Sequence, residues 1–321
     1  MKSAPGAFGL VLFLTFLPLS AAAETGTREF TCPVDDQKFT STVVTATNKA
    51  GGLDSDLCSY ERGTQALPFE VHTCPSCGFS AVTKEFEQGF AADLGKKISE
   101  ALAKWKEANH VAEWSRIAPW QRYELAAICG LEKFGSLKHA GTMYARAAWC
   151  ARQEAVAEAS TEADLSDPVS TMEYVDMFTA RIKAQPDTAK QNEMKFQLAR
   201  IYERAGMCLQ RDEVIKGLDA KAPAEPSYAR FKELIGIERK YLEEAAADYR
   251  KAIDSGEITG NDTGLYEYLI ADFSRRMGKY SEAIGGYEKA LKTEGLRPDV
   301  RELATFLLAA VKSKETPAQE K

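Results

Sequence analysis

Histidine is scarce in this sequence, whose 321 residues contain only His72, His110 and His139. No His-Glu-x-x-His segment occurs, and His110 and His139 have no potential ligand at a metal-binding spacing. Catalytic zinc centres commonly use histidine ligands and leave one coordination position to water. The sequence therefore supplies poor material for a catalytic zinc centre.

Two other catalytic signatures are missing as well. The segment around Ser80 lacks the second glycine of a nucleophile elbow. Residues 89–96 are one residue too long for a phosphate loop, and Lys97 replaces the hydroxyl residue that would follow, so we expect a helix to start there. We therefore expect that the protein is not an enzyme.

An excess of positive charge is also absent. Lys and Arg together number 41 against 47 Asp and Glu, which gives a formal net charge of -6. Binding to nucleic acid needs a cationic surface that neutralises phosphates, and polybasic membrane binding needs one that faces anionic lipids. Neither nucleic acid nor a membrane surface is therefore the expected partner.

Long apolar runs are absent beyond the first residues. Lys2 precedes an apolar run over residues 7–17, Pro18 breaks this run, and three alanines end at Ala23. This order is typical of a secretory signal peptide, so we expect residues 1–23 to be removed and the protein to be exported, to the periplasm or the extracellular space. An uncleaved N-terminal anchor is the alternative. No later segment is apolar enough to span a bilayer.

What the sequence does contain is an unusual concentration of cysteine near its start. Four of the seven cysteines fall within residues 24–86. Short β-type runs at residues 39–45 and 69–73, punctuated by glycines, predict a small β head over this segment. The other three cysteines lie in helical apolar patterns, where we expect small core residues. These three are Cys129, Cys150 and Cys208.

The remainder, residues 87–312, has a helical pattern with an internal repeat. The spacing Ala-x3-Tyr-x2-Ala occurs three times, starting at Ala140, Ala245 and Ala283. The intervals are close to multiples of the 34-residue period of tetratricopeptide (TPR) helix pairs. We therefore predict a mainly α protein, in which a small β zinc-ribbon-like head is followed by a TPR-like α-helical solenoid. An irregular helical bundle is the alternative, and residues 313–321 are expected to form a disordered tail.

Four helix pairs can be placed on this pattern. The clearest covers residues 265–291 with Gly278 at its turn, and a last helix follows from Asp299 to about Val311. Two further pairs turn at Gly135 and Gly206, and a fourth covers residues 228–253 without a glycine at its turn. Residues 160–170 and 222–226 are expected to form connecting segments, the first of them leading into a helix that ends near residue 184.

Two short phrases in the head resemble each other. Cys32-Pro33-Val34-Asp35 is repeated as Cys74-Pro75-Ser76-Cys77, and the second phrase is a tight turn that aims two thiolates at one point. Structural zinc takes four tetrahedral ligands, of which Cys32, Cys74 and Cys77 supply three. The first choice for the fourth ligand is Cys58, because its sulfur suits zinc, and the alternates are Asp35 and His72.

The head resembles the bacterial domain of unknown function numbered 2225. That family's order of elements is matched over residues 30–82 by the two knuckles, by Lys38-Phe39, by Asp56-Leu57-Cys58 and by Gly78-Phe79. The sequence departs from the family where Asp35 replaces the second cysteine of the first knuckle. The resemblance implies a zinc-ribbon-like segment followed by TPR-like helices, and no activity, because the family's activity is unassigned.

Two alternatives to a structural zinc site remain open. An oxidising compartment favours disulfides, with Cys74–Cys77 or Cys32–Cys58 as the pairs. A Cys-x-x-Cys segment at a helix start can also catalyse redox chemistry.

The sequence thus predicts an exported protein-interaction module. The solenoid would hold a protein or peptide on its concave face, with Arg200, Glu203 and Arg275 as candidate contact residues. The alternative function is a metal- or thiol-dependent enzyme or a metal carrier centred on the head, in which Asp35 leaves zinc open to water. The oligomeric state is not indicated by the sequence.

Overall fold

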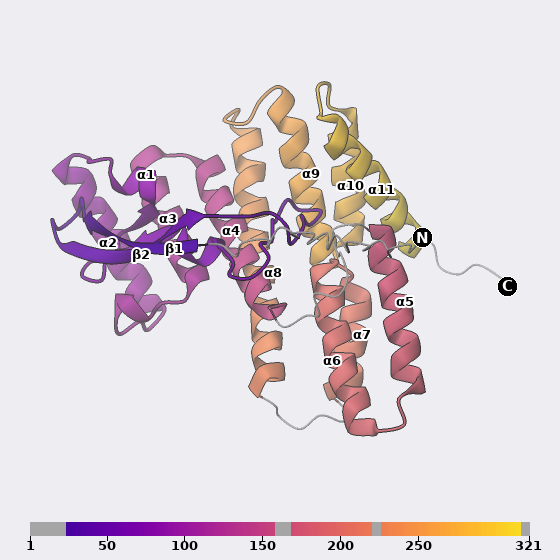
Figure 1. The fold of residues 1–321 in the computed structure, drawn as a ribbon. Helices are drawn as coiled ribbons and strands as arrows, with labels where there is room; N and C mark the ends of the chain where they lie inside the picture. Colours follow the sequence, from indigo (N-terminus) through magenta and orange to yellow (C-terminus); the bar gives the residue numbers. More distant parts are fainter. Residues whose placement is uncertain (1–23, 158–167, 220–225, 316–321) are drawn as a thin grey trace, which may run out of the picture.

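The chain is mainly α-helical, with two small antiparallel sheets near its start (Figure 1). The computed structural model describes residues 24–157, 168–219 and 226–315. This arrangement confirms the predicted fold class of a mainly α protein with a small β head. The expected signal peptide, most of the segment 160–170 and nearly all of 222–226 lie outside the described residues.

The head is built from two hairpins. Strands β1 (Glu24–Thr31) and β2 (Lys38–Ala46) form one antiparallel ribbon, and β3 (Val71–Thr73) pairs with β4 (Ser80–Val82) in the other. Strands β2 and β3 follow the two predicted β-type runs, whereas β1 and β4 were not predicted. The single turn η1 (Leu67–Phe69) precedes β3, and the short helix α1 (Thr83–Phe86) follows β4.

The hydrophobic core of the head does not stop at residue 86, where the sequence suggested a boundary. Phe30, Phe79 and Phe86 share one cluster with Ile98 and Leu102 of helix α2 (Ala92–Ala108). The turn η2 (Trp114–Arg116) and one face of α3 (Pro119–Phe134) contribute further members of this cluster. The head therefore folds as one unit with the first long helices, because the two small sheets alone bury too little apolar surface.

Within the described residues, eight further helices make up the helical body. Helix α4 (Leu137–Ala155) packs along α8 (Pro226–Asp254), and α9 (Asn261–Arg276) packs against α10 (Tyr280–Lys292). The remaining helices are α5 (Pro168–Ala184), α6 (Thr188–Arg204), α7 (Cys208–Asp219) and α11 (Pro298–Glu315). Figure 1 shows α9, α10 and α11 side by side, with α5, α6 and α7 grouped at the other end of the body.

Three of the four predicted helix pairs are present. The turns between α3 and α4, α6 and α7, and α9 and α10 contain Gly135, Gly206 and Gly278, each with a positive φ that other residues rarely adopt. The alanines and tyrosines of the repeated spacing are buried on the packing faces of α4, α8 and α10, except that Tyr144 is half-buried.

The predicted fourth pair is wrong. Residues 228–253 belong to the single continuous helix α8, which has 29 residues. No proline interrupts this stretch, and Gly236 stands among strong helix formers, which propagate a helix through one glycine. The predicted tail is also partly wrong, because α11 continues through Glu315. The helix expected to end near residue 184 is α5.

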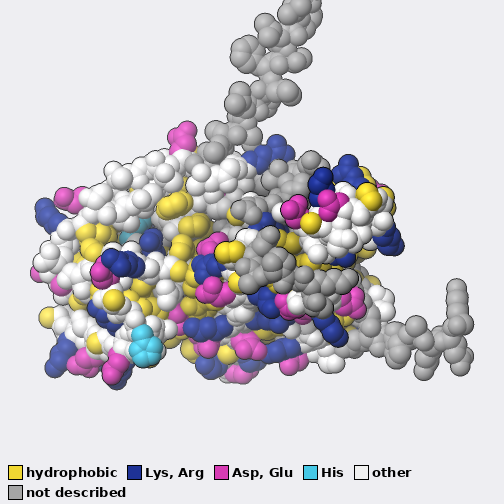
Figure 2. Space-filling view, turned by 90° about the horizontal axis from the view of Figure 1, so that it is seen from below, with side chains coloured by type: hydrophobic (Ala, Val, Ile, Leu, Met, Phe, Trp, Pro, Cys, Tyr) yellow, Lys and Arg dark blue, Asp and Glu magenta, His cyan; other side chains and the backbone are white. Residues whose placement is uncertain are grey.

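The face of the molecule seen in Figure 2 carries charges of both signs. In Figure 2, Lys and Arg side chains alternate with Asp and Glu along the helical body, and hydrophobic side chains lie between them. Among the described helices, none is long and apolar enough to cross a membrane.

Candidate metal centre and buried charge network

The two cysteine phrases form equivalent turns. The backbone N–H of Asp36 donates to Cys32 O, and that of Gly78 donates to Cys74 O, both at 2.9 Å. The N–H of each leading cysteine also donates to the carbonyl five residues later, again at 2.9 Å. Asp36 and Gly78 both have a positive φ. The first turn therefore places Asp35 where the second places Cys77.

Gly78 is required at its position for two reasons. Its φ is +82°, and a Cβ atom there would lie 2.6 Å from the ring of Trp114. Trp114 itself is buried and stacks on Trp105 with ring centroids 6.0 Å apart. The second knuckle is thus held against the first long helix of the chain.

The two turns bring four potential ligands together. The ligand atoms of Cys32, Asp35, Cys74 and Cys77 all lie within 4.8 Å of one another. The Sγ atoms of Cys32 and Cys77 are 3.5 Å apart, and Cys74 Sγ lies 3.7 Å from both carboxylate oxygens of Asp35. The cluster could hold a metal ion.

These separations fit a tetrahedral ion with thiolate ligands. A Zn–S bond of about 2.3 Å places two sulfurs about 3.8 Å apart in a tetrahedral site. The measured separations lie near this value, and three sulfurs with one carboxylate oxygen form a donor set that suits zinc better than a hard cation. The cluster thus resembles a zinc site in the distances between its ligand atoms and in the chemical type of its donors.

Hydrogen bonds among the three thiols distribute their protons unequally. Hydrogen bonds from Cys32 and Cys77 lower the pKa of Cys74 to about 2, while the bond to Cys74 raises the pKa of Cys32 to about 12. Bonds to Cys32 and Cys74 also raise the pKa of Cys77. A metal ion that binds all three sulfurs must therefore displace protons, so acid should weaken its binding.

The first choice for the fourth ligand needs correction. Cys58 does not lie in this cluster, because it is buried with Tyr60 and Val156, where the side-chain amide of Gln153 contacts its sulfur at 3.9 Å. The alternate Asp35 lies with the three cysteines instead. Cys32 and Cys58 lie in different core clusters and both are free thiols, so the predicted Cys32–Cys58 disulfide is not formed in this structure.

His72 faces away from the cluster. Its ring lies within hydrogen-bonding distance of Ser41 Oγ (3.0 Å) and Thr83 Oγ1 (2.8 Å), and it stacks on Phe30 at 4.3 Å. Burial lowers the pKa of His72 to about 4. It is a buried, neutral core residue and not a member of the cysteine cluster.

The three helical cysteines are buried, as predicted from their apolar surroundings. Cys129, Cys150 and Cys208 are each at most 3% exposed. Burial raises the pKa of the Cys129 thiol to about 12. All seven cysteines are free thiols.

Comparison with known proteins bears on this part of the chain. Residues 26–166 match the DUF2225 family model, described as an uncharacterized protein conserved in bacteria. The match confirms the resemblance seen in the cysteine phrases. It extends past the DUF2225-like head to include α2, α3 and α4. No curated protein and no solved structure matched the chain.

A second cluster lies outside the cysteine head, where a loop of the DUF2225 segment enters the helical body. The loop leaves β2, turns at residues 53–57 and returns to η1. Its backbone is held as a narrow hairpin by reciprocal bonds, in which Gly51 N–H donates to Tyr60 O and Tyr60 N–H donates to Gly52 O. Leu57 adopts a positive φ of 69° at the tip, where the chain reverses.

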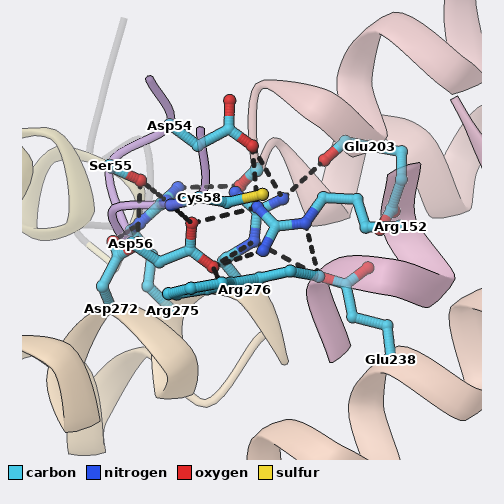
Figure 3. A network of polar contacts seen from close by, with 12 residues as sticks. Asp54, Ser55, Asp56, Cys58, Arg152, Glu203, Glu238, Asp272, Arg275 and Arg276 are labelled. Atoms are coloured by element: carbon cyan, nitrogen blue, oxygen red, sulfur yellow. Dashed lines mark hydrogen bonds and ion pairs between the residues drawn. The ribbon is translucent and has the colours of Figure 1, made fainter. Parts of the chain in front are cut away.

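The tip carries two aspartates into a buried site (Figure 3). Asp54 and Asp56 are 6% and 0% exposed, and both accept hydrogen bonds from Arg152 of α4. Arg152 is itself fully buried and also contacts Glu238 of α8 at 3.2 Å. Arg276 of α9 lies 3.8 Å from Asp56 and 3.4 Å from Glu238. Two arginines thus bind carboxylates from the loop and from α8.

Ser55, between the two aspartates, contacts a neighbouring ion pair. Its hydroxyl donates to Asp272 and accepts from Arg275, both at 2.8 Å, and Arg275 binds Asp272 at 2.6 Å. The hydroxyl of Tyr268 donates to the carbonyl oxygen of Ser55. The loop tip is therefore bound to α9 by backbone and side-chain contacts.

The acids of this network differ in their protonation behaviour. Burial favours the neutral acid at Asp56, but the charges of Arg152 and Arg276 outweigh it and hold its pKa well below the usual range. For Asp54 burial prevails and raises the pKa. Burial and the nearby Glu203 raise the pKa of Glu238 well above its usual value.

This network corrects the predicted contact residues. Arg200, Glu203 and Arg275 are only 6%, 2% and 7% exposed. Glu203 pairs with Arg211, and Arg275 with Asp272 and Ser55. The inner side chains of α6 and α9 are thus largely covered by the chain's own elements, including the acidic loop.

Sequence reasoning missed the members of this network. The family resemblance included Asp56, but without a role, and nothing in the sequence linked it to Arg152 or Arg276. The available signal was a set of isolated charges among apolar residues on helix faces. A charged residue on an apolar helix face can be assigned to a buried ion pair only when its partner residue is known.

Proposed function

We propose that this protein is an exported protein-interaction module, in which the helical body binds a protein or peptide and the head holds a structural zinc ion. The observation that carries the interaction role is a cavity of about 700 Å³ on the helical body. It is lined by the loop at residues 49–59, by α5, by the turn between α6 and α7, and by α11. Its lining is mostly apolar, which is typical of binding sites.

Exposed hydrophobic side chains converge on this cavity. Six large hydrophobic residues of the described chain are strongly exposed, and three of these line the cavity. Leu53, Met172 and Phe306 come from the loop, α5 and α11, and are 49%, 45% and 48% exposed. Isolated exposed hydrophobic residues need no explanation, but a converging group favours a binding surface.

Support for a structural zinc ion comes from the head. Three sulfurs and one carboxylate oxygen lie within 4.8 Å of one another, close enough to share one metal ion, and both turns are fixed by backbone hydrogen bonds. Zinc would supply a cross-link between the two hairpins, whose sheets are small. Cys32, Cys74, Cys77 and Asp35 would be its ligands, which closes the coordination shell and suits a structural role.

The helix pairs with glycine turns support the proposed TPR-like arrangement of the body. The binding surface differs from the one expected from sequence. The proposed surface lies between the loop and α11, and of the three candidate contact residues only Arg275 lines it.

In-cell photo-crosslinking tests the interaction role. A benzoylphenylalanine would replace Phe306 in one variant and Phe134, which is 44% exposed on α3, in a matched control. We expect a covalent protein adduct at position 306 and none at position 134. If further exposed positions across the helical body also give no adduct, the interaction role is wrong.

Metal analysis tests the zinc role. Protein purified from its native compartment should contain one zinc ion per chain, and its thiols should resist alkylation until zinc is chelated. Protein without zinc, whose head cysteines are present as disulfides, would contradict the structural zinc site.

A further inference from the structure

The cavity between the loop and α11 has a regular apolar wall. Leu303, Phe306, Leu307 and Ala310 line it, with the i, i+3, i+4, i+7 spacing of a single helix face. Val300 and Ala304, on the adjoining face of α11, are buried in the main core. Leu307 belongs to the same core cluster and Leu303 packs against it, whereas Phe306 is exposed. The wall is therefore the margin of the core-facing side of α11, with Phe306 as its most exposed member.

Such a wall fits a helical ligand. Residues 303–310 extend for about 10 Å along the helix axis, which corresponds to about two turns of an apposed helix. Side chains at the same spacing on a partner helix can pack into its grooves. Recognition of an amphipathic helix by a hydrophobic groove is a common mode of peptide binding.

The polar side of the cavity adds a charge preference. Three cationic residues line it, Lys49, Arg204 and Arg275, together with the acidic Asp54. Arg275 is neutralised by Asp272 and Asp54 by Arg152. Lys49 and Arg204 form no ion pair with any carboxylate of the described residues.

Arg204 is held in place without a salt bridge among the described residues, although its charge lowers the pKa of Asp54, whose carboxylate Arg152 binds. Its guanidinium stacks over the ring of Tyr60, 4.2 Å from the centroid, and donates to Gly51 O. Its Nε atom is buried and has no hydrogen-bond partner. A fixed guanidinium at the edge of an apolar cavity favours an incoming carboxylate.

We infer that the cavity binds an acidic amphipathic helix of a partner protein. Apolar side chains of this helix pack against Phe306 and Leu53, and its carboxylates meet Lys49 and Arg204. This inference depends on the proposed interaction role and adds the chemistry of the partner to it.

Peptide binding to the full chain tests the inference. The probe is a fluorescent peptide of about four helical turns, with Leu and Phe at the i, i+3, i+4, i+7 positions and Glu on the flanks. A matched peptide carries Lys in place of every Glu. Fluorescence anisotropy measures both affinities at low and high salt, and oleate is added as a competitor.

Four variants locate the site. Phe306→Glu places a charge on the apolar wall and should weaken binding of the acidic peptide about tenfold or more. Lys49→Glu should weaken it about fivefold and reduce its salt dependence. Phe134→Glu and Lys97→Glu change exposed residues of the same types on α3 and α2, and should leave the affinity unchanged.

Each result of these binding measurements either supports or overturns the inference. Saturable binding of the acidic peptide, lost in Phe306→Glu and retained in the controls, supports the inference. Equal binding of the Lys peptide, or equal losses in all four variants, overturns it. Binding of oleate without binding of the acidic peptide assigns the cavity to a lipid and also overturns it. A crosslinked partner at position 306 that lacks an acidic helix would overturn this inference while leaving the interaction role intact.

Discussion

The metal-type cluster of the head and the charge network of the helical body are both polar cross-links, but they are assembled differently. The head cluster takes its four potential ligands from two short turns of equivalent backbone geometry. The network takes single residues from a loop and from α4, α8 and α9, and Asp56 lies 96 positions before its partner Arg152. Each half of the head cluster is thus formed within one short turn of the chain. The network instead depends on the whole fold.

The head and the helical body are joined through the loop that contributes to the charge network. The loop that carries Asp54 and Asp56 leaves the first hairpin of the head and returns to the second. Its two ends therefore belong to the hairpins of the head, and its tip is fixed by arginines of the body. A charge that is buried at the tip cannot be released to water without moving the loop or the helices.

The largest expected effect follows removal of the central cation of the network. Arg152→Met keeps a long unbranched side chain but leaves Asp54, Asp56 and Glu238 buried without their main counter-charge. We expect the free energy of unfolding to fall by about 4 kcal/mol, as for other broken buried ion pairs. Urea unfolding followed by circular dichroism measures this change.

Two controls make that measurement specific. Arg230→Met removes a half-exposed arginine that pairs with Glu154 at 2.8 Å, and should cost only about 0.5 kcal/mol. Adding Asp56→Asn to Arg152→Met should cost less than the sum of the two single changes, because the stranded charge is removed. Additive losses would show that the pair is not coupled.

The next effect concerns the ligand that distinguishes the two knuckles. Cys74→Ser should abolish stoichiometric zinc, because the serine hydroxyl is a poor zinc ligand. Asp35→Cys completes a four-sulfur site and should tighten zinc binding about tenfold or more, whereas Asp35→Ala should weaken it by a similar factor. Competition with a chromogenic chelator measures all three affinities.

Cys58→Ser is the matched control for this series. Cys58 lies outside the cluster, so its replacement should leave zinc affinity unchanged even if it lowers stability. A loss of zinc in this variant, or an unchanged affinity in Asp35→Ala, would contradict the ligand set.

The difference between the two cross-links also explains what sequence could predict. The three sulfur ligands and the candidate Asp35 followed from fixed spacing within two short phrases. The helix pairs followed from Ala and Tyr spacing and from glycine turns. The role of Arg152 did not follow, because a single charged residue in a helix has no local pattern that identifies its distant partner. The course of α8 was missed because a break was inferred from repeat length alone.

The pH dependence of stability should separate the acids of the network. The pKa of Asp56 is lowered, so its contribution is present above its unfolded pKa of about 3.8 and is lost as pH falls through the folded value. The advantage of the native protein over Asp56→Asn should therefore shrink in acid. The pKa of Glu238 is raised, so its contribution is present below about 4.5 and is lost as pH rises through the folded value.

Glu238→Gln should consequently gain relative to the native protein as pH rises above 4.5, by up to about 1 kcal/mol per pH unit. Unfolding free energies of the native protein and both variants, measured from pH 3 to pH 8, test these opposite trends. Because the three proteins share the same head, their differences cancel the pH dependence of metal binding. Parallel curves for the native protein and both variants would contradict the assigned directions.

The smallest effect concerns Ser55, which shows whether hydrogen bonds or charges hold the loop tip. In Ser55→Ala the ion pair of Asp272 and Arg275 remains intact, and the hydroxyl of Tyr268 still donates to the backbone carbonyl of residue 55. We expect a loss of only about 1 kcal/mol in unfolding free energy. Ser115→Ala, at an exposed serine bonded to Glu113, should be close to neutral. A loss in Ser55→Ala as large as that in Arg152→Met would mean that the hydroxyl, rather than the aspartates beside it, anchors the loop in the helical body.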